Sequence, residues 1–382
     1  MVEKKMIRVL HAIDTTGPGG AETVFVTLAG KLDPSEYKSF AAIHGPGWVA
    51  DSLRANGIEP IFIQSKGTFN FAYLWNLITL IRKHKIDIVL SHLLGSNLYC
   101  SIAGLLCRIP VLSIFHGFVD SSENERAMQI KVNAINIGSK KIVFVSDMLG
   151  KEFIGRFGFS SRKSVTVYNG VETSVFKPQR DETLRAELGI LPDHILIGAV
   201  GNIRPAKDYH TFLKAARQVY DKNSKCRFVI VGQGRGALYQ SLLNLRADLG
   251  LADICFFTGF RDQASVLYNN FDVFLSTSIS EGFSISTIEA LACGLPVVAT
   301  RSGGPDEIIR LSGCGVLCDH DVQSIAESVL KTIETQDQSA DSASIRNRCV
   351  ENLFSTRVML QKYESLIIEA CSKKHKIEKQ KF

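Results

Sequence analysis

Two glutamates separated by seven residues form the most informative spacing in this chain, in the stretch Glu281-Gly-Phe-Ser-Ile-Ser-Thr-Ile-Glu289. The second half of the stretch is predicted to begin a helix, and backbone N–H groups in the turn before a helix can bind an anion. A helix rises about 1.5 Å per residue, so the two carboxylates lie about 12 Å apart along the axis. That spacing suits a long ligand with a phosphate group in its middle.

Each glutamate also has an ordinary structural explanation. Ser286-Thr-Ile-Glu289 matches a capping box, in which Glu289 would bind only the backbone at the start of its own helix. Glu281 would be placed before a helix by the helix dipole alone. Both alternatives stay open on the sequence.

Two turns that follow predicted strands carry groups suited to phosphate binding. Gly17-Pro-Gly-Gly-Ala-Glu22 follows the first strand, and its glycines would let backbone amides approach a phosphate or a sugar hydroxyl. Its spacing is not G-x-G-x-x-G, so a dinucleotide site is not indicated, and an ordinary strand-to-helix turn is the alternative. Arg204 and Lys207 follow the first strand of the second half of the chain. Two cations on a turn that enters a helix suit a diphosphate, the alternative being a solvated surface pair.

A histidine also stands where a ligand site is expected. His116 directly follows the strand at residues 111–115, and the carboxyl ends of parallel strands border the ligand crevice in such folds. There the ring would either hydrogen-bond a sugar hydroxyl or serve as a structural polar group. His92 ends the preceding strand and is a weaker candidate, either as a neighbour of His116 or as a polar residue of the core.

The composition is that of an ordinary globular protein with more than one domain. The chain has 382 residues, and its 44 basic and 38 acidic residues give a net charge of +6. This charge is too small to indicate nucleic acid binding. The N-terminus has no long apolar signal segment, and polar residues interrupt the apolar stretch at 86–115, so no membrane span is predicted. Nine cysteines without a C-x-x-C pair are typical of reduced thiols in a cytosolic protein.

Apolar strands alternate with helical segments, which predicts α/β domains with parallel sheets covered on both faces. Strands are predicted at 6–13, 37–44, 60–63, 86–91, 111–115, 141–145, 165–168, 195–201, 227–231, 254–257, 273–275, 297–300 and 315–318. Helices are predicted at 21–31, 48–56, 71–84, 96–107, 122–137, 147–157, 207–220, 238–249, 264–268, 284–293, 305–311, 321–333 and 354–370. The polar residues 171–193 are predicted to be a linker and 334–344 a loop, so two doubly wound domains facing a ligand cleft are expected.

The basic C-terminus and two patterns that resemble metal sites have ordinary structural explanations. The C-terminal residues 372–382 are basic, and a solvated mobile end is favoured over weak attraction to an anionic membrane surface. Asp319-His-Asp321 resembles a metal-binding Asp-x-Asp, but Asp321 is expected to cap the next helix. Cys314 and Cys318 lack a second pair of ligands, so zinc is not expected.

Taken together, these residues resemble the retaining glycosyltransferases of family four, which have the GT-B fold of two Rossmann-like domains. Each matching element is weak alone, but the set follows the family's order over nearly the whole chain. The elements are Gly19-Gly20-Ala21-Glu22, His116-Gly117, Asn169-Gly170-Val171, Arg204…Lys207, Gly232-Gln-Gly234, Thr258-Gly259-Phe260, Glu281…Glu289 and Gly303-Gly304…Glu307. The resemblance implies an acceptor-binding domain at 1–171, joined by a helix at 354–371, a donor domain at 172–353 and a basic tail at 372–382.

The resemblance implies which residues act on a nucleotide diphosphate sugar, with UDP as the expected nucleotide. Catalytic roles are implied for Glu281, His116, Lys207 and Arg204. Substrate binding is implied for Gly19, Gly20, Gly232, Phe260, Gly282, Phe283, Ser284, Ile285 and Glu289. In the family, the residue matching Glu289 holds the ribose, and the amides around Ser284 meet the diphosphate. Many members have an arginine at the position of Asn202, so Lys207 is a firmer assignment than Arg204.

The implied reaction breaks the anomeric C–O bond of the donor, and a nucleotide diphosphate leaves. Two cations and a helix N-terminus would stabilise the departing charge, so no metal or other cofactor is expected. The expected route is attack on the same face, with the leaving phosphate accepting the acceptor's proton. The acceptor is expected to be a glycan or lipid-linked, bound by loops at 45–48, 67–73 and 118–126, in cell-envelope polysaccharide or glycoconjugate synthesis. A cytoplasmic location, at the inner face of the membrane if the tail binds lipid, is expected.

Two other functions remain open on the sequence. A non-hydrolysing sugar-nucleotide epimerase would use the same donor without an acceptor, so incubation with donor alone separates it from a transferase. A non-catalytic nucleotide-sugar-binding subunit would not need Glu281, Lys207 and Glu289 together, and this chain has all three.

Overall fold

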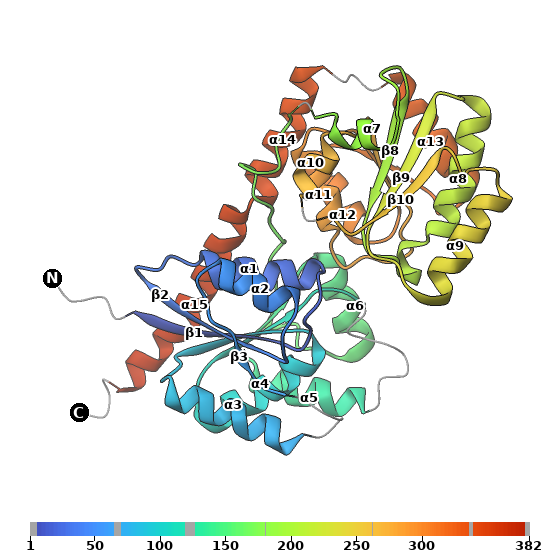
Figure 1. Ribbon diagram of the computed structural model, residues 1–382. Helices are drawn as coiled ribbons and strands as arrows, with labels where there is room; N and C mark the ends of the chain where they lie inside the picture. Colours follow the sequence, from blue (N-terminus) through green and yellow to red (C-terminus); the bar gives the residue numbers. More distant parts are fainter. Residues whose placement is uncertain are drawn as a thin grey trace. The chain divides into compact units, whose positions relative to one another are not determined.

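The computed structural model describes residues 6–64, 70–118, 127–179, 181–261, 263–335 and 339–378. The chain forms two units (Figure 1). The first comprises the chain up to Asn169 and from Arg357 onward, and the second comprises Gly170–Thr356. Each unit contains one parallel sheet with helices, which confirms the predicted class of two Rossmann-like α/β domains.

The first unit contains a seven-stranded sheet in the order β3-β2-β1-β4-β5-β6-β7. Its strands are β1 Ile7–Ile13, β2 Tyr37–Ile43, β3 Ile61–Phe62, β4 Ile88–His92, β5 Val111–Phe115, β6 Lys141–Phe144 and β7 Ser164–Thr166. Its helices are α1 Gly20–Lys31, α2 Trp48–Ala55, α3 Phe71–Lys83, α4 Leu94–Cys107, α5 Met128–Gly138 and α6 Asp147–Phe157. In Figure 1, α1 and α2 cover one face of the sheet, and α3, α4 and α5 cover the other.

The second unit contains a six-stranded sheet in the order β10-β9-β8-β11-β12-β13. Its strands are β8 Ile195–Val200, β9 Cys226–Val231, β10 Cys255–Gly259, β11 Val273–Ser276, β12 Val297–Thr300 and β13 Val316–Cys318. Helices α8 Tyr209–Lys222, α9 Gly236–Asp248 and α13 Val322–Thr335 cover one face (Figure 1). The other face carries α10 Ala264–Tyr268, α11 Ile285–Ala292 and α12 Gly304–Ser312.

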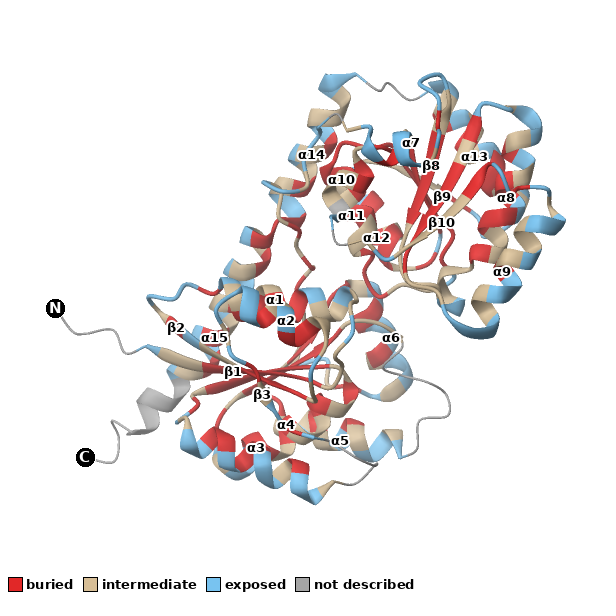
Figure 2. Ribbon diagram, viewed as in Figure 1, coloured by how far each residue is buried: buried red, intermediate tan, exposed pale blue. Residues whose placement is uncertain are grey.

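Both sheets reverse their strand order at the same relative place. In each unit the first strand pairs with the second strand on one side and the fourth on the other, as β1 does with β2 and β4. The central strands β4, β5, β11 and β12 are buried along their whole length (Figure 2). Burial on both faces explains why these strands are continuous apolar runs in the sequence. Ligands of such folds bind outside the carboxyl ends of the strands, at the point of reversal.

The chain passes between the units twice, and the two passages lie side by side. The Val171 N–H donates to the Phe354 carbonyl at 2.9 Å, and the Thr356 N–H donates to the Val171 carbonyl at 2.9 Å. At Gly170, a Cβ would lie 2.5 Å from the Ser355 carbonyl oxygen, so only glycine fits this close approach.

The last helix, α15 Thr356–Glu378, packs largely on the first unit. Lys141 Nζ of β6 lies 3.4 Å from Glu369 Oε1, and Tyr363 and Ile367 are fully buried. The helix extends beyond its predicted end at residue 370, so residues 372–378 of the basic tail are helical. None of the helices in the described part of the chain is long and apolar enough to cross a membrane.

The predicted linker at 171–193 is wrong, because contacts of its side chains and backbone tie it to the second unit. Asn270 Nδ2 donates to Asp181 Oδ1 at 2.8 Å, and its Oδ1 accepts from the Leu184 N–H at 3.1 Å. Arg185 Nε donates to the Asn270 carbonyl at 2.9 Å, and residues 183–187 form the short helix α7 Thr183–Glu187. The polar composition of residues 171–193 predicts a linker, but this segment is part of the second unit.

The predicted loop at 334–344 is also wrong in part, because helix α14 Ala340–Phe354 begins within it. Polar contacts add to the packing of its buried residues Val350 and Phe354. Arg346 Nε donates to the Gly294 carbonyl at 2.7 Å, and Asn347 Nδ2 donates to the Ala292 carbonyl at 2.6 Å. Parts of six predicted features lie outside the described residues: the helix at 122–137, the acceptor loops at 67–73 and 118–126, the segments 171–193 and 334–344, and the tail at 372–382.

Candidate functional site

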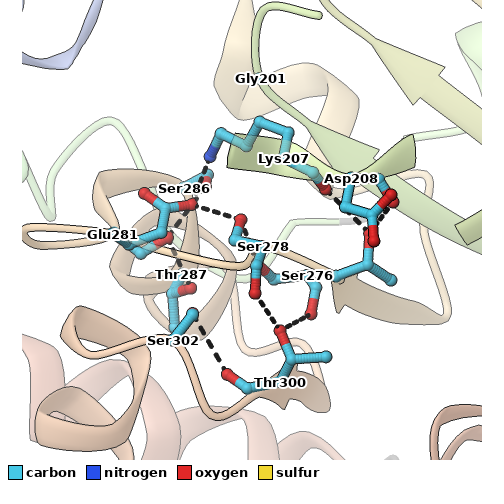
Figure 3. A network of polar contacts seen from close by, with 12 residues as sticks. Gly201, Lys207, Asp208, Ser276, Ser278, Glu281, Ser286, Thr287, Thr300 and Ser302 are labelled. Carbon is cyan, nitrogen blue, oxygen red and sulfur yellow. Dashed lines mark hydrogen bonds and ion pairs between the residues drawn. The ribbon is translucent and has the colours of Figure 1, made fainter. Parts of the chain in front are cut away.

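Three turns meet at the carboxyl edge of the second sheet, beside the point where its strand order reverses (Figure 3). They follow β8, β11 and β12. Thr277 Oγ1, after β11, donates to the Lys207 carbonyl in the turn after β8 at 3.0 Å. The Glu281 backbone forms two hydrogen bonds with the turn after β12: its N–H donates to the Ser302 carbonyl at 2.8 Å, and its carbonyl accepts from the Gly304 N–H at 2.9 Å. These backbone bonds fix the site residues on rigid strand ends.

Lys207 and Glu281 form an ion pair at the centre of these turns. Lys207 Nζ lies 2.6 Å from Glu281 Oε1, and Ser278 Oγ donates to the same oxygen at 2.7 Å (Figure 3). The two side chains are only 21% and 13% exposed. An ammonium group has three N–H donors, so Lys207 can keep Glu281 and still donate to an anionic ligand. The predicted catalytic pair is thus one unit, in which the carboxylate positions the cation.

Two glycines make room for Lys207. A Cβ on Gly201 would lie 2.8 Å from Lys207 Cε, so a side chain there would push the lysine away from its place. A Cβ on Gly232, at the end of β9, would overlap the Gly201 carbonyl. The buried Tyr209 fixes the same peptide, because its hydroxyl donates to the Gly201 carbonyl at 2.8 Å. The sequence predicted Gly232 as a substrate-binding residue, and its close approach gives it a structural task as well.

The first turn of α11 is held from both sides. The Phe283 ring packs against Phe354 with centroids 5.6 Å apart, which anchors the residue inward. On the other side, a Cβ on Gly304 would lie 2.6 Å from Phe283 Cα and 3.0 Å from Ser284 N. The first N–H groups of a helix have no acceptor within it. The predicted anion-binding backbone at Gly282, Phe283, Ser284 and Ile285 is therefore a rigid helix N-terminus next to an ammonium group.

Glu289 does not cap its own helix. The residue that precedes α11 is Ser284, which places Glu289 more than a turn inside the helix, so the capping-box alternative is wrong. Its Oε2 accepts instead from the Tyr268 hydroxyl at 2.8 Å. Burial raises the pKa of Glu289 to about 7, although the Tyr268 hydrogen bond and the charge of Lys207 oppose the shift. A partly buried carboxyl held by one oxygen retains a second oxygen for ligand hydroxyls.

The other predicted site residues of the second unit are not part of the Lys207–Glu281 ion pair or of the Glu289 hydrogen bond. Arg204 is exposed, and among the described residues no carboxylate pairs with it. Asn202, where the resemblance led us to expect arginine, accepts at its Oδ1 from the Gln233 N–H at 3.1 Å. It therefore joins the turns after β8 and β9. Phe260, after β10, is 42% exposed, as a residue that stacks on a ligand would be.

Three side chains of the site were not singled out from the sequence. Ser278 and Tyr268 hold the two glutamates, and His320 Nε2 lies 3.1 Å from Asp208 Oδ2 and 3.2 Å from the Thr277 carbonyl. Asp208 in turn caps α8. Ser278 and Glu281 are three residues apart, but the other contacts join residues distant in the chain, and no local pattern marks those. Asp-His-Asp was discounted as a metal motif, and its histidine instead braces the turn after β11.

The predicted cap by Asp321 is confirmed, because its Oδ1 accepts from the Ser324 N–H at 2.9 Å. Asp319 Oδ1 lies 3.3 Å from Arg301 Nε. In the described ranges, no group of three or more His, Cys, Asp or Glu side chains is placed to hold a metal ion.

A pair of neutral histidines marks the corresponding edge of the first unit. His92 Nδ1 lies 2.8 Å from His116 Nε2, and the rings stack with an angle of 13° between their planes. Burial lowers the pKa of His116 to about 3, and burial together with the charges of His116 and His11 lowers that of His92. At neutral pH one uncharged imidazole donates to the other. His92, the weaker candidate in the sequence, is thus the residue that orients His116.

The glycine-rich turn of the first unit lies beside a carboxyl group that the sequence did not single out. Gly19 immediately precedes α1, and Gly20 is its first residue. Asp14, just after β1, lies against Gly95 so closely that a Cβ there would overlap its carboxylate. Burial raises the pKa of Asp14 to about 6, although hydrogen bonds from backbone groups, including that of Ser96, oppose the shift. Asp14 thereby holds the turn after β1 against the start of α4.

Comparison with known proteins places both halves of the chain in one group. A family model described as "Glycosyl transferases group 1" matches residues 180–375, and one described as "Glycosyltransferase Family 4" matches residues 18–175. The chain is 24% identical over 331 residues to an Escherichia coli UDP-Gal:alpha-D-GlcNAc-diphosphoundecaprenol alpha-1,3-galactosyltransferase, covering 84% of this chain and 85% of the relative.

Two further matches differ in extent. A D-inositol 3-phosphate glycosyltransferase of Thermobifida fusca is 30% identical over 239 residues, which cover 60% of this chain and 54% of that protein. The crystal structure of Anabaena HepE in complex with UDP-glucose superposes with a TM-score of 0.84 at 21% identity, covering 96% of this chain and all of that one. The structural match shows a common fold.

Proposed function

Because this chain belongs to the glycosyl transferases group 1 family and is a glycosyltransferase of the GT-B type, we propose that it is a retaining enzyme that transfers a sugar from a UDP-sugar to a lipid-linked glycan acceptor. One observation carries the proposal. The buried Lys207–Glu281 pair, with an N···O distance of 2.6 Å, lies where the turns before α8 and α11 meet. A cation and a helix N-terminus together form a site for a diphosphate.

The identity of the donor rests on the relatives and on Glu289. HepE was crystallised with UDP-glucose, and the name of the Escherichia coli relative specifies UDP-Gal. Glu289 is the acceptor for the ribose hydroxyls, because its Oε2 is held by Tyr268 and its pKa of about 7 leaves much of it ionised at neutral pH. A carboxylate accepts hydrogen bonds from both hydroxyls of a ribose.

The transfer breaks the bond between the anomeric carbon and the diphosphate oxygen. The electron pair of that bond leaves with UDP, and Lys207 together with the first N–H groups of α11 stabilises the growing negative charge. The acceptor hydroxyl forms its new bond to the anomeric carbon on the same face, and its proton passes to the departing phosphate oxygen. Glu281 holds the ammonium in place through its 2.6 Å contact and is not the nucleophile.

The proposal assigns no metal ion to the reaction. The positive charge that a divalent cation would supply comes from Lys207, with Arg204 as a second and more exposed cation. Fixed donors that need no reorganisation are the most effective way to stabilise charge that develops in a transition state.

The acceptor site belongs to the first unit in this proposal. The His92–His116 pair is uncharged, so it suits sugar hydroxyls better than phosphates. A lipid-linked acceptor is supported by the Escherichia coli relative, whose name specifies a diphosphoundecaprenol-linked sugar. Such an acceptor places the enzyme in envelope polysaccharide or glycoconjugate synthesis, at the cytoplasmic face of the membrane that carries the lipid.

Thermal-shift measurements with a panel of nucleotides and nucleotide sugars, followed by transfer assays, test the proposal. UDP and a UDP-sugar should raise the Tm, whereas ADP- and GDP-sugars should raise it less. The matching donor should then label a diphosphate-lipid-linked sugar, and nuclear magnetic resonance of the product should show the same anomeric configuration as the donor. A product of inverted configuration contradicts the retaining mechanism, and isomerised donor without acceptor points to an epimerase.

A further inference from the structure

A pocket with a volume of about 580 Å³ opens at the amino ends of β1, β4 and β5 in the first unit. It is lined by Arg8, Ile81, Arg82, Lys85, Ile86, Asp87, Leu106, Cys107, Arg108 and Ile109. His116 and the glycine-rich turn lie at the other edge of the same sheet. With about 3.3 Å per strand residue, Arg8 is roughly 17 Å from the end of β1, so this pocket is separate from the candidate active site.

Four cations line the pocket with one acid. The cations are Arg8, Arg82, Lys85 and Arg108, and among the described residues none of their side chains has an ion pair or a hydrogen bond. The acid, Asp87, is already engaged, because its Oδ2 accepts from the backbone N–H of Arg8 at 3.0 Å. Cations gathered around one cavity without acidic partners repel one another, and a bound anion removes that cost.

Two of the cations occupy a backbone conformation that favours glycine. Lys85, two residues after the end of α3, has φ 51°, and Arg108, directly after the end of α4, has φ 57°. In both places the helix ends with the same hydrogen bond, from the Ile86 N–H to the Ile81 carbonyl and from the Ile109 N–H to the Gly104 carbonyl, each 3.0 Å long. Glycine is the usual residue in this arrangement. At both positions the chain has a cationic residue in this strained backbone conformation, and strain of this kind is concentrated at functional sites.

Attraction to the two helix C-termini does not account for these cations. Each helix end carries about half a negative charge, so α3, α4 and Asp87 together offset only about two of the four positive charges. The carbonyls at residues 81 and 104 already accept the backbone N–H groups of Ile86 and Ile109. Roughly two positive charges therefore remain for a ligand.

We propose that this pocket binds the phosphate group of an anionic ligand. Phosphate is the anion whose charge and size match several Arg and Lys donors converging on one cavity. The rim adds apolar surface, since Leu106 is 57% exposed and the neighbouring Leu105 is 48% exposed. A phosphate next to an apolar group is the chemistry of a phospholipid headgroup, and a soluble phosphate ester shares the phosphate.

The test uses the full-length chain and the double variant Lys85→Gly/Arg108→Gly. Glycine removes both cations at positions where the backbone favours glycine, so the variant should fold with an unchanged or higher Tm. The control is Lys83→Ala/Lys151→Ala, which removes the same charge from two exposed residues of the first unit that do not line the pocket. Binding of inorganic pyrophosphate is measured by calorimetry, and binding to vesicles of phosphatidylglycerol or phosphatidylcholine by sedimentation.

Alkylation of Cys107 in the pocket, followed by peptide mass spectrometry, locates the binding. If pyrophosphate slows alkylation in the wild type and the control, and the double variant binds it about tenfold more weakly at this site, the ligand is a soluble phosphate. If phosphatidylglycerol vesicles slow the alkylation of Cys107 and bind the double variant more weakly, while pyrophosphate does neither, the ligand is a lipid headgroup. The proposal is overturned if neither probe protects Cys107, or if protection in the double variant equals that in the wild type.

Discussion

The first six strands of the two sheets have the same order, but the side chains at their carboxyl edges differ in charge. In the second unit, Lys207 and Glu281 form a mostly buried ion pair with an N···O distance of 2.6 Å. In the first unit, the corresponding edge holds His92 and His116, 2.8 Å apart and with pKa values lowered by burial. One edge thus carries an ion pair and the other an uncharged pair of histidines.

This difference shows how one architecture is given two tasks. The strand order 3-2-1-4-5-6 places the turns after the first, fourth and fifth strands next to each other in both units. In the second unit these turns supply Lys207, Glu281 and Gly304, and in the first unit the glycine-rich turn, His92 and His116. The strand order determines which turns lie next to each other, and the residues in those turns determine which ligand groups the edge can bind. We therefore assign the diphosphate to the second unit and acceptor hydroxyls to the first.

The largest effect is expected from Lys207→Ala. Loss of the cation should lower kcat by about 10²–10³-fold, because one preorganised donor to a developing charge is worth that much. Transfer rates at saturating donor and acceptor check this. Lys214→Ala, an exposed change in α8, is the matched control and should leave the rate unchanged. Equal rates for the two variants would mean that the charged edge does not act on the leaving group.

Glu289→Gln should weaken UDP binding by about 10–100-fold, because charge-assisted hydrogen bonds to the ribose are lost. In the wild type, UDP affinity should also increase from pH 6 to pH 8 as Glu289, with its pKa of about 7, ionises. Calorimetric titrations at several pH values measure both effects. In the variant the rise with pH should disappear, and an unchanged rise would assign it to another group.

The same substitution should change how stability depends on pH. The pKa of Glu289 is raised from 4.5 to about 7 in the folded chain, so the folded state binds more protons than the unfolded state between these values. The contribution of Glu289 to the free energy of unfolding is thus full below about pH 4.5 and is lost as the pH rises through about 7. Chemical denaturation of Glu289→Gln should show a shallower decline over this window. An identical decline would mean that Glu289 is not buried as a neutral acid.

A smaller effect, of about tenfold on acceptor use, is expected from His92→Phe. Phenylalanine keeps the ring but cannot orient His116 through the 2.8 Å hydrogen bond. The specificity constant for the acceptor should fall, while the Kd for UDP stays the same. Since the pKa of His116 is lowered to about 3, the wild-type rate should show no histidine inflection near pH 6.5. A changed UDP affinity would contradict the division of tasks between the units.

The smallest effect, about fivefold or less on kcat, is expected from Arg204→Ala. Arg204 is exposed, and a solvated cation stabilises charge less than a buried one. The effect should shrink further as salt is added, because exposed charges are screened. Steady-state rates at low and high ionic strength measure this. A loss as large as that of Lys207→Ala would place Arg204 on the phosphate when ligand is bound.

The sheets could be predicted from the sequence, because buried parallel strands appear in it as short runs of apolar residues. Every predicted strand was found, and the paired glutamates, the cations and His116 all lie at carboxyl edges as expected. Helix α14 was missed because its buried face combines Arg346 with Val350 and Phe354, so the polar bonds of Arg346 and Asn347 replace part of the apolar pattern. Segment 171–193 was misjudged because its binding partner, Asn270, is distant in the chain.

The roles of individual side chains were harder to predict than their places. Lys207 and Glu281 are 74 residues apart, so their contact depends on how β8 and β11 pair. The capping box at Ser286 had the right residue types, but the residue that precedes the helix is Ser284, two positions earlier, and Glu289 accepts from the Tyr268 hydroxyl instead. His92 was ranked below His116, although the two rings are hydrogen-bonded to each other. In each case the missing information is a contact between elements, which no local pattern contains.

Hydrogen–deuterium exchange of the full-length chain, with and without UDP, tests most directly the claim that the second unit holds the diphosphate and the first does not. We expect slower exchange at residues 201–208 and 281–289, at the start of α8 and α11, and no change at 14–20 or 111–118. Protection of the turns in the first unit, with none at the start of α11, would contradict the account.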